Sequence, residues 1–333
     1  MHLLPALLEI RFPWIDPVAL DLPGPVDVRW YGLAYLLGFA AAYALLLRMS
    51  RDGFIPLDRE GVGGLVTAGV LGVVLGGRLG YVLFYDFADF ASSPLRILRV
   101  WEGGLSFHGG AAGVIVAAWW YARRERLGFL RLGDAAALVA PFGLFAGRVA
   151  NFVNGELYGR VASPDVPWAM RFPTDPAALR RLGAEGGGMR SREEAIGAAY
   201  RSGAWERVRE EVPLRHPSQL YEAVLEGVVL AAVLWGVYAW MRRRGRTLPP
   251  GTYGGIFLLG YGLARSFVEL FRQPDAQFRS ADDPVGTVLG PLTMGQALSA
   301  VMVVAGLLLV ARALRPRAHP DYGVAEPLEP PLG

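Results

Sequence analysis

The amino-acid sequence predicts an all-α polytopic membrane protein with seven transmembrane helices and one extended outer-side segment between spans four and five. Of its 333 residues 53% are hydrophobic, and the mean hydropathy of +0.31 is high for a soluble domain. Long charge-free runs recur along the chain, and arginines cluster beside them. Runs of this length and flanking charges of this kind are typical of helices that cross a bilayer.

The chain begins with a segment, 1–29, that we interpret as an N-terminal interfacial arm. Its prolines argue against a spanning helix, and Phe12 and Trp14 suit aromatic anchors at the membrane surface. The first ten residues lack a basic stretch and a cleavage site, so we expect a mature arm rather than a signal peptide.

Seven apolar stretches follow the arm and predict the spans. Spans one to four fall within 30–153, and spans five to seven fall within 218–314. Their expected bounds are about 30–47, 62–84, 104–121, 134–153, 218–240, 252–271 and 294–313. In the second span, the spacing of Gly76 and Gly80 favours the close approach of another helix.

Two polar segments complete the organisation. The segment 154–217 combines Pro, Gly and alternating charges, which is typical either of a partly ordered domain outside the membrane or of a flexible insert. The Pro-rich segment 315–333 is predicted to be a disordered cytoplasmic tail. Arginine clusters follow spans one, three, five and seven, so the N-terminus is predicted outside and the C-terminus in the cytoplasm.

Composition excludes several classes of chemistry. The chain has no Cys, which excludes a thiol nucleophile and a disulfide framework. It also has no Lys, since all its basic side chains other than His are Arg, and this excludes a lysine base. Its four His have no ligand spacing, so we predict no metal site and no cofactor. The arginines stand beside membrane segments, which indicates topology rather than nucleic-acid binding.

One polar motif closes the fourth span. Arg148, Asn151 and Asn154 recur at i, i+3 and i+6 and share a helix face, with Glu156 just beyond. A guanidinium at a helix centre in hydrocarbon costs roughly 2.5–3.5 kcal/mol on insertion scales, so it normally faces protein, water or an anion. Two interpretations remain open at this point. Either the guanidinium group of Arg148 binds a phosphate, or Arg148 reaches the membrane interface and the neighbouring Asn residues cap the helix.

The remaining ionisable residues of the spans gather toward the outer half of the predicted bilayer, as a site facing the external leaflet would require. Tyr261, Arg265 and Glu269 form one stripe, which is either part of that site or an intrahelical ion pair of Arg265 with Glu269. We favour a structural role for Glu222 and Glu226, in pairing with Arg78 or Arg148. His108, between glycine pairs, and Tyr31, an interfacial anchor by default, complete the set.

Several blocks of the sequence together resemble the prolipoprotein diacylglyceryl transferase family. The motif Gly-Arg-x-x-Asn-Phe-x-Asn-x-Glu-x-x-Gly, which ends at Gly159, carries the resemblance most strongly. Five other blocks, in the same order and covering spans one to six, are Arg29–Gly32, Gly76–Tyr81, Gly103–Gly110, His216–Glu222 and Arg265–Asp275. The 154–217 segment looks expanded relative to the family, and the arm and tail match nothing in it.

The resemblance implies a bacterial inner-membrane transferase. Such an enzyme moves the diacylglyceryl group of phosphatidylglycerol onto the lipobox cysteine of a prolipoprotein, forms a thioether and releases glycerol phosphate. Its partners are then this lipid, the lipobox segments and the membrane. Arg148 and Arg265, from two helices, suit a clamp on the phosphate of the leaving group.

The same resemblance implies roles for the other motif residues. His108 is the candidate general base, because the substrate thiol, with an ordinary pKa of about 8.5, needs help to ionise. Tyr31, Asn151, Glu156 and Glu269 are candidate orienting groups. Substrate binding is assigned to Arg148, Asn154, Gly159 and Tyr261.

Three alternatives remain open from sequence. A carboxylate, Glu156 or Glu269, takes the proton in place of His108. A small-solute transporter would instead line a path with these charges, but it would spread them through the bilayer depth. The third alternative is a different intramembrane lipid enzyme or a protease. It lacks support, because the sequence contains neither the zinc-binding motif His-Glu-x-x-His nor the serine-nucleophile motif Gly-x-Ser-x-Gly.

Overall fold

The computed structural model describes residues 10–22, 27–84, 87, 93–99, 104–274, 283 and 286–315. The predicted tail, apart from its first residue, and the first nine residues of the arm lie outside these ranges. The chain divides into two compact units. The first comprises 1–38, 141–233 and 257–306, and the second comprises 39–140, 234–256 and 307–333.

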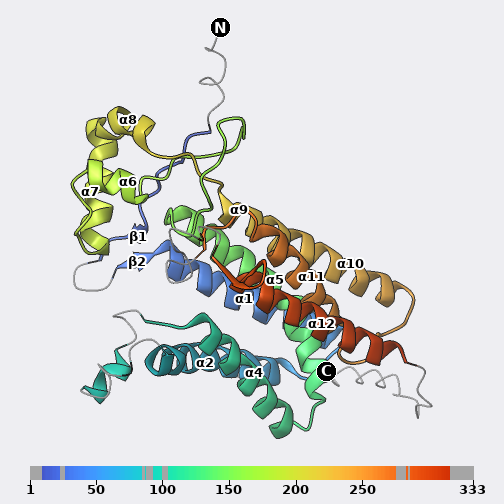
Figure 1. Cartoon of the computed structure of the whole chain (residues 1–333). Helices are drawn as coiled ribbons and strands as arrows, with labels where there is room; N and C mark the ends of the chain where they lie inside the picture. Colours follow the sequence, from blue (N-terminus) through green and yellow to red (C-terminus); the bar gives the residue numbers. More distant parts are fainter. Residues whose placement is uncertain are drawn as a thin grey trace. The chain divides into compact units, whose positions relative to one another are not determined.

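Helices occupy all seven positions at which spans are predicted (Figure 1). They are α1 (Trp30–Arg51), α2 (Arg59–Phe84), α4 (Phe107–Arg124), α5 (Phe129–Val153), the continuous helix Ser218–Arg243, α11 (Thr252–Val268) and α12 (Met294–Leu314). The helix Ser218–Arg243 consists of α9 (Ser218–Glu222), the π-helical segment η5 (Ala223–Val229) and α10 (Leu230–Arg243). Ser218, which the sequence places after Pro217 as a helix start, is indeed its first residue.

Five of these helices are long and apolar enough to cross a membrane, counting only the described residues: α1, α2, α5, Ser218–Arg243 and α12. Leucines such as Leu36, Leu37 and Leu308 are exposed along them, as side chains in contact with lipid would be. The protein is therefore a polytopic membrane protein. The other two predicted spans fall short of this standard. With 17 residues, α11 is about 26 Å long, less than the roughly 30 Å of a hydrocarbon core.

The 154–217 segment of the first unit is a folded helical insert, which favours the ordered alternative of the two predicted for it. It contains α6 (Pro176–Arg181), α7 (Met189–Ser202), α8 (Ala204–Val208) and a short 3-10 turn, Arg209–Glu211. Asp175 caps α6 by accepting a hydrogen bond from the Ala177 amide at 2.8 Å. Ala178, Trp205 and Val212 form one small core, and Leu179 and Ile196 form another.

The described part of the N-terminal arm packs on this insert. Phe12, expected as a membrane anchor, is only 5% exposed because it lies among Phe152 and Phe172. Trp14, the other expected anchor, stacks on Tyr200 with ring centroids 5.7 Å apart. Both aromatic residues therefore have partners within the protein, which the sequence pattern alone does not reveal, and the interfacial position of the arm stays a prediction.

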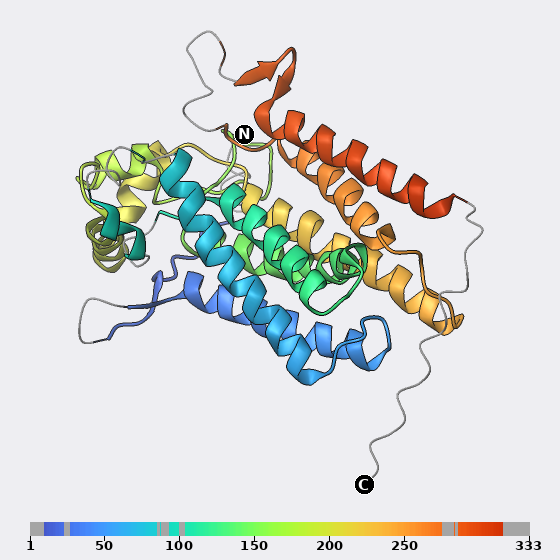
Figure 2. The ribbon, with the colours of Figure 1, turned by 90° about the horizontal axis from the view of Figure 1, so that it is seen from below.

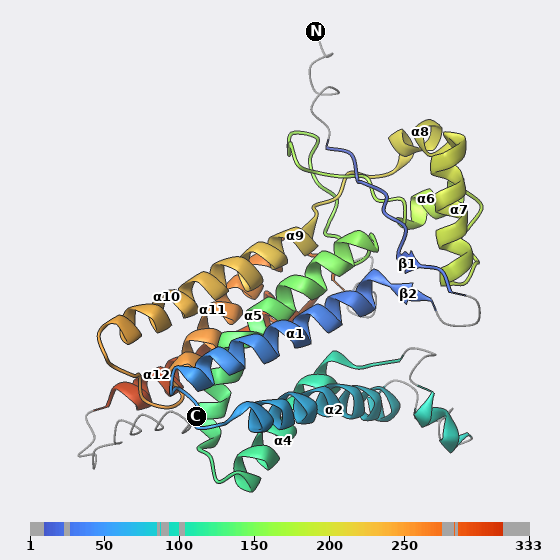
Figure 3. The same ribbon diagram turned by 180° about the vertical axis from the view of Figure 1, so that it is seen from behind.

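Two short antiparallel hairpins flank the helices of the first unit. Strands β1 (Val18–Leu20) and β2 (Val28–Arg29) pair beside α7 and lead directly into α1 (Figure 3). Arg29 is tied to the insert by two hydrogen bonds to Glu193, at 2.8 and 3.0 Å. Strands β3 (Thr287–Leu289) and β4 (Leu292–Thr293) pair just before α12, which runs alongside α11 (Figure 2).

In the second unit, α2 and α4 pack backbone against backbone through glycines (Figure 3). A Cβ on Gly80 would lie 2.7 Å from the Cα of Gly109, and one on Gly76 would lie 2.7 Å from the Cα of Gly113. The close approach predicted from Gly76 and Gly80 is therefore confirmed. Nearby, the Arg78 side chain is buried and donates to backbone carbonyls, including that of Ile97 at 3.0 Å.

The second unit also holds a buried carboxylate that caps a helix. Asp134 of α5 is fully buried and accepts hydrogen bonds from the amides of Gly251 and Gly254, both at 2.8 Å. These amides lie at the start of α11, where the first N–H groups have no partner within the helix. Asp134 therefore fixes the N-terminus of α11.

The glycine contact yields a stability prediction. Replacing Gly76 by Ala forces α2 away from α4, because the new methyl group meets backbone atoms that cannot rotate aside. We expect a loss of roughly 1–3 kcal/mol of stability, as for other overpacked contacts. Thermal unfolding in detergent measures it. Gly69→Ala on the same helix, where nothing lies within 4 Å, is the matched control and should leave the melting temperature unchanged or higher. Equal melting temperatures for the two variants would contradict the packing argument.

Candidate functional site

A cluster of charged side chains from three helical segments lies buried in the first unit. Arg148 comes from the end of α5, Glu222 and Glu226 come from α9 and η5, and Arg265 comes from α11. Glu269 and Arg272 follow directly after α11. The cluster thus joins residues that are more than 100 positions apart in the sequence.

Glu222 is the centre of the cluster. Its carboxylate lies 2.7 Å from Nε of Arg148, 3.3 Å from Nη1 of Arg272 and 3.7 Å from Nη1 of Arg265. One carboxylate therefore contacts guanidinium groups from three places in the chain. The structural pairing that we favoured for Glu222 is confirmed with Arg148, whereas Arg78 belongs to the other unit and binds carbonyl groups.

The other two carboxylates complete the charge balance. Glu269 contacts Nη1 of Arg265 at 2.7 Å, and Glu226 lies 3.9 Å from Nη2 of Arg148. Glu222 and Glu226 are fully buried, and the side chains of Arg148 and Arg265 are each 15% exposed. Buried charges persist when opposite charges match them, and here three arginines match three glutamates.

The intrahelical pair of Arg265 with Glu269, which was one alternative for the polar stripe, is present but is not isolated. It is part of the larger cluster through Glu222. Tyr261, the third member of the stripe, is 9% exposed and stacks on Phe257 with ring centroids 5.8 Å apart. The stripe therefore faces the interior of the first unit along its whole length.

A polar turn follows Arg148 at the end of α5. The Asn151 side chain donates to the Glu156 carboxylate at 2.9 Å, and Asn154 donates to the same oxygen at 3.3 Å. Gly155 adopts a φ of 65°, which is easy only for glycine and lets the chain reverse after the helix. Tyr31, at the start of α1, lies close enough to interact electrostatically with Asn151 and Glu156. The predicted orienting residues Tyr31, Asn151 and Glu156 thus lie together.

After this turn, the chain at Gly159 forms backbone hydrogen bonds with two other segments, one at His216 and one at Phe271. Its amide donates to the His216 carbonyl at 2.8 Å, and the Arg160 amide donates to the Phe271 carbonyl at 2.7 Å. A Cβ on Gly159 would meet the Phe271 carbonyl and His216, so a side chain is excluded here. Burial lowers the pKa of His216, whose Nδ1 lies 3.1 Å from the Tyr221 hydroxyl. His216 is therefore part of the entry to the helix that begins at Ser218.

His108, the candidate base, lies in the second unit. It is an exposed residue in the first turn of α4, two residues after Ser106, which caps that helix by accepting from the Gly109 amide at 3.3 Å. The backbone of His108 is therefore held in place by the capped start of α4 and by the glycine contact between α4 and α2.

Sequence reasoning missed three residues that the structure adds to the cluster and its surroundings. Arg272 contacts Glu222, Thr293 donates to Glu269 at 3.0 Å, and Gln219 donates to the Glu156 carbonyl at 2.6 Å. Arg272 and Gln219 stood in the recognised blocks, so position within a motif was the available signal. For Thr293, the Thr-x-x-Gln pattern that opens α12 was the only signal.

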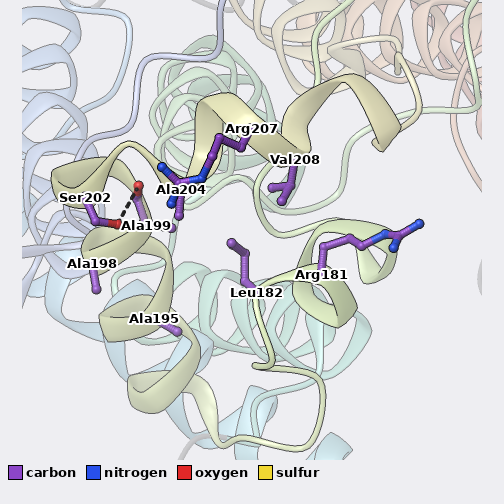
Figure 4. A pocket seen from close by; sticks show the side chains of 9 residues that line it. All are labelled: Arg181, Leu182, Ala195, Ala198, Ala199, Ser202, Ala204, Arg207 and Val208. Carbon is purple, nitrogen blue, oxygen red and sulfur yellow. Dashed lines mark hydrogen bonds between the residues drawn. The ribbon is translucent and has the colours of Figure 1, made fainter.

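The insert carries a separate open hollow of about 470 Å³, with Leu182 at its floor and Arg207 at its edge (Figure 4). It is lined by residues of α6, α7 and α8 and includes no member of the charged cluster. Among the described residues, no group of three His, Asp or Glu is arranged to hold a metal ion.

Comparison with known proteins identifies the family of this chain. A family model for prolipoprotein diacylglyceryl transferase matches residues 17–312. The chain is 44% identical to the phosphatidylglycerol–prolipoprotein diacylglyceryl transferase of Sodalis glossinidius (strain morsitans), over 94% of this chain and 97% of that protein. It is 43% identical to the enzyme of that name from Rhodospirillum rubrum, over 94% of this chain and 98% of that protein. The chain therefore belongs to the prolipoprotein diacylglyceryl transferase family.

Proposed function

We propose that this transferase takes the diacylglyceryl group from phosphatidylglycerol and places it on the lipobox cysteine of a prolipoprotein. The observation that carries the proposal is that Arg148 and Arg265, from two helices, meet around one carboxylate in a buried polar cluster. The family and the names of the relatives supply the reaction. The cluster supplies a place for the anionic headgroup of the lipid.

The chemistry explains why arginines suit this task. The thiol sulfur attacks the glyceryl carbon that bears the phosphate, a C–S bond forms and the C–O bond to phosphate breaks. Negative charge grows on the phosphate oxygens as glycerol phosphate leaves, and the thiol proton passes to a base. Guanidinium groups placed at those oxygens stabilise the leaving group more in the transition state than in the bound lipid.

The carboxylates prepare the arginines for this role. Each guanidinium has five N–H donors in a fixed plane, and a carboxylate on one edge leaves the other edge for a phosphate. Glu222 against Arg148 and Glu269 against Arg265 hold the two planes before the lipid arrives. Binding then requires little reorganisation, which is a main source of catalytic power.

We assign the proton transfer to His108 and supporting roles to the polar turn. His108 takes the thiol proton as general base, as the family resemblance implies. Tyr31, Asn151 and Glu156 orient substrate groups, and Glu269 orients Arg265. Asn154, Gly159 and Tyr261 shape the lipid site together with Arg148. A carboxylate base, Glu156 or Glu269, remains the alternative to His108.

The membrane arrangement that goes with this function has seven spans. We propose that α4 and α11 cross the membrane together with the five longer helices. The N-terminus and the insert are then outside, and the C-terminus is in the cytoplasm, in agreement with the arginine clusters after spans one, three, five and seven. The membrane is the bacterial inner membrane.

Mass spectrometry of a lipobox peptide tests the proposed reaction. The peptide is incubated with the purified protein and phosphatidylglycerol in detergent, and we expect it to gain one diacylglyceryl group on its cysteine. A peptide with Ser in place of Cys and a reaction without phosphatidylglycerol are the controls. No mass gain with folded protein would reject the assignment and favour the transporter alternative.

Arg148→Ala and Arg265→Ala should each lower the rate of transfer at least about 100-fold, the effect of losing one donor to a developing oxyanion. Both variants should still insert into the membrane. Initial rates with the lipobox peptide measure the effect. Arg181→Ala, at an exposed position of the insert, is the matched control and should keep the wild-type rate. Near-full activity in both cluster variants would exclude the phosphate clamp.

His108→Gln separates the two candidate bases through the pH profile. A base works only when deprotonated, so the rate in the wild-type enzyme rises with pH through the acid limb of the profile. If His108 is the base, the variant loses both most of its rate, by roughly 100-fold or more, and that limb. An unchanged rate and profile would assign the proton to a carboxylate instead.

A further inference from the structure

The carboxylate of Glu269 is held from both sides. Its Oε2 contacts Nη1 of Arg265 at 2.7 Å, and its Oε1 accepts a hydrogen bond from the Thr293 hydroxyl at 3.0 Å. Glu269 is 5% exposed and Thr293 is 4% exposed. Water is therefore largely kept from this bond, which strengthens a hydrogen bond to a charged acceptor.

The direction of the Thr293 hydroxyl is set by the start of α12. Its oxygen accepts from the Gln296 amide at 3.3 Å, while the Gln296 side chain accepts from the Thr293 amide at 3.2 Å. This reciprocal pair is a capping box, which fixes Thr293 as the cap of the helix. Because the hydroxyl oxygen accepts from Gln296, the hydroxyl proton is left to point at Glu269.

Gly295, in the first turn of α12, makes room for the carboxylate. A Cβ at this position would lie 2.6 Å from the carboxyl carbon of Glu269, so glycine alone lets the helix N-terminus approach the charge. A second glycine contact supports the approach: a Cβ on Gly262 of α11 would lie 2.9 Å from the Ser299 carbonyl of α12. The two helices run side by side there (Figure 2). A carboxylate at a helix N-terminus is also stabilised by the helix dipole.

We propose that Thr293 and Gly295 are positioning residues for the transfer reaction. They hold the Glu269 carboxylate, and Glu269 in turn orients the guanidinium of Arg265 toward the phosphate of the lipid. The inference rests on the proposed headgroup clamp and extends it to α12, which contributes no charged group to the cluster. It also disfavours Glu269 as the general base, since both of its oxygens are already engaged.

The first test compares variants of Thr293 that differ by a hydroxyl. Thr293→Val keeps the shape and removes the donor, and Thr293→Ser keeps the donor. We expect Thr293→Val to lower kcat/KM for phosphatidylglycerol about 10-fold to 100-fold, the usual range for a lost hydrogen bond to a charged group. Thr293→Ser should stay within about threefold of wild type. Equal losses in both variants, or no loss in Thr293→Val, would overturn the proposal.

The second test asks whether Thr293 acts through Glu269. Binding of phosphatidylglycerol in detergent is measured by native mass spectrometry for Thr293→Val, Glu269→Gln and the double variant. We expect the double variant to bind no more weakly than Glu269→Gln, because interacting residues are not additive. A full additional loss in the double variant would show an independent structural effect and would reject the inference.

Two further variants keep the outcomes distinct. Gly295→Ala should weaken lipid binding as Thr293→Val does, so the proposal can be tested even if one of them unfolds. Val301→Ala, at a position of α12 that is 67% exposed, is the control and should bind lipid normally. Wild-type lipid binding by Arg265→Ala would show that the headgroup clamp itself is wrong. Weak binding by Arg265→Ala with normal binding by Thr293→Val and Gly295→Ala would reject only the positioning role.

Discussion

The contact of one buried carboxylate with three guanidinium groups is the constraint on which the first unit depends. Glu222 is fully buried and is contacted by Arg148, Arg265 and Arg272. Removing one partner from a buried pair typically costs about 3–5 kcal/mol, because the remaining charge has nowhere to be solvated. The ends of α5, α9 and α11 are therefore tied to a single point. This contact joins three of the six sequence blocks that carry the family resemblance, those that contain Arg148, Glu222 and the pair Arg265 and Arg272.

A paired cluster also resolves a difficulty of placing arginine in a lipid-binding protein. An unpaired guanidinium in the outer half of a bundle would be unstable without a ligand, whereas a guanidinium fully enclosed by carboxylates would be unavailable to one. The cluster lies between these limits, with Arg148 and Arg265 each 15% exposed. It contains three carboxylates beside three guanidinium groups, so each arginine has an acidic neighbour before lipid binds.

The sequence predicted the long elements well because their signals are local. Apolar runs located helices at all seven positions, and the spacing of Gly76 and Gly80 located a helix contact. The pairing of Glu222 with Arg148 followed from the need to match a buried charge. Arg272 was missed because it stands past the end of an apolar run, where an arginine is ordinarily a topology signal. Of the seven helices, α4 and α11 do not meet the combined length and hydropathy expected of a spanning helix, because apolar runs predict where a helix lies better than where it ends.

The fold of the 154–217 insert could not be predicted from the sequence. Its hydrophobic cores are small, and its helices carry many charged residues of both signs. The sequence therefore shows no hydrophobic periodicity from which these helices could be predicted. Trp14 and Arg29 of the arm bind Tyr200 and Glu193 of the insert, and the arm continues without a break into Trp30 and Tyr31. The insert thus restrains the first turn of α1 through its contacts with the arm. A truncated variant without α7 would lose the partners of Trp14 and Arg29, and the first turn of α1, which carries Tyr31, would be less restrained.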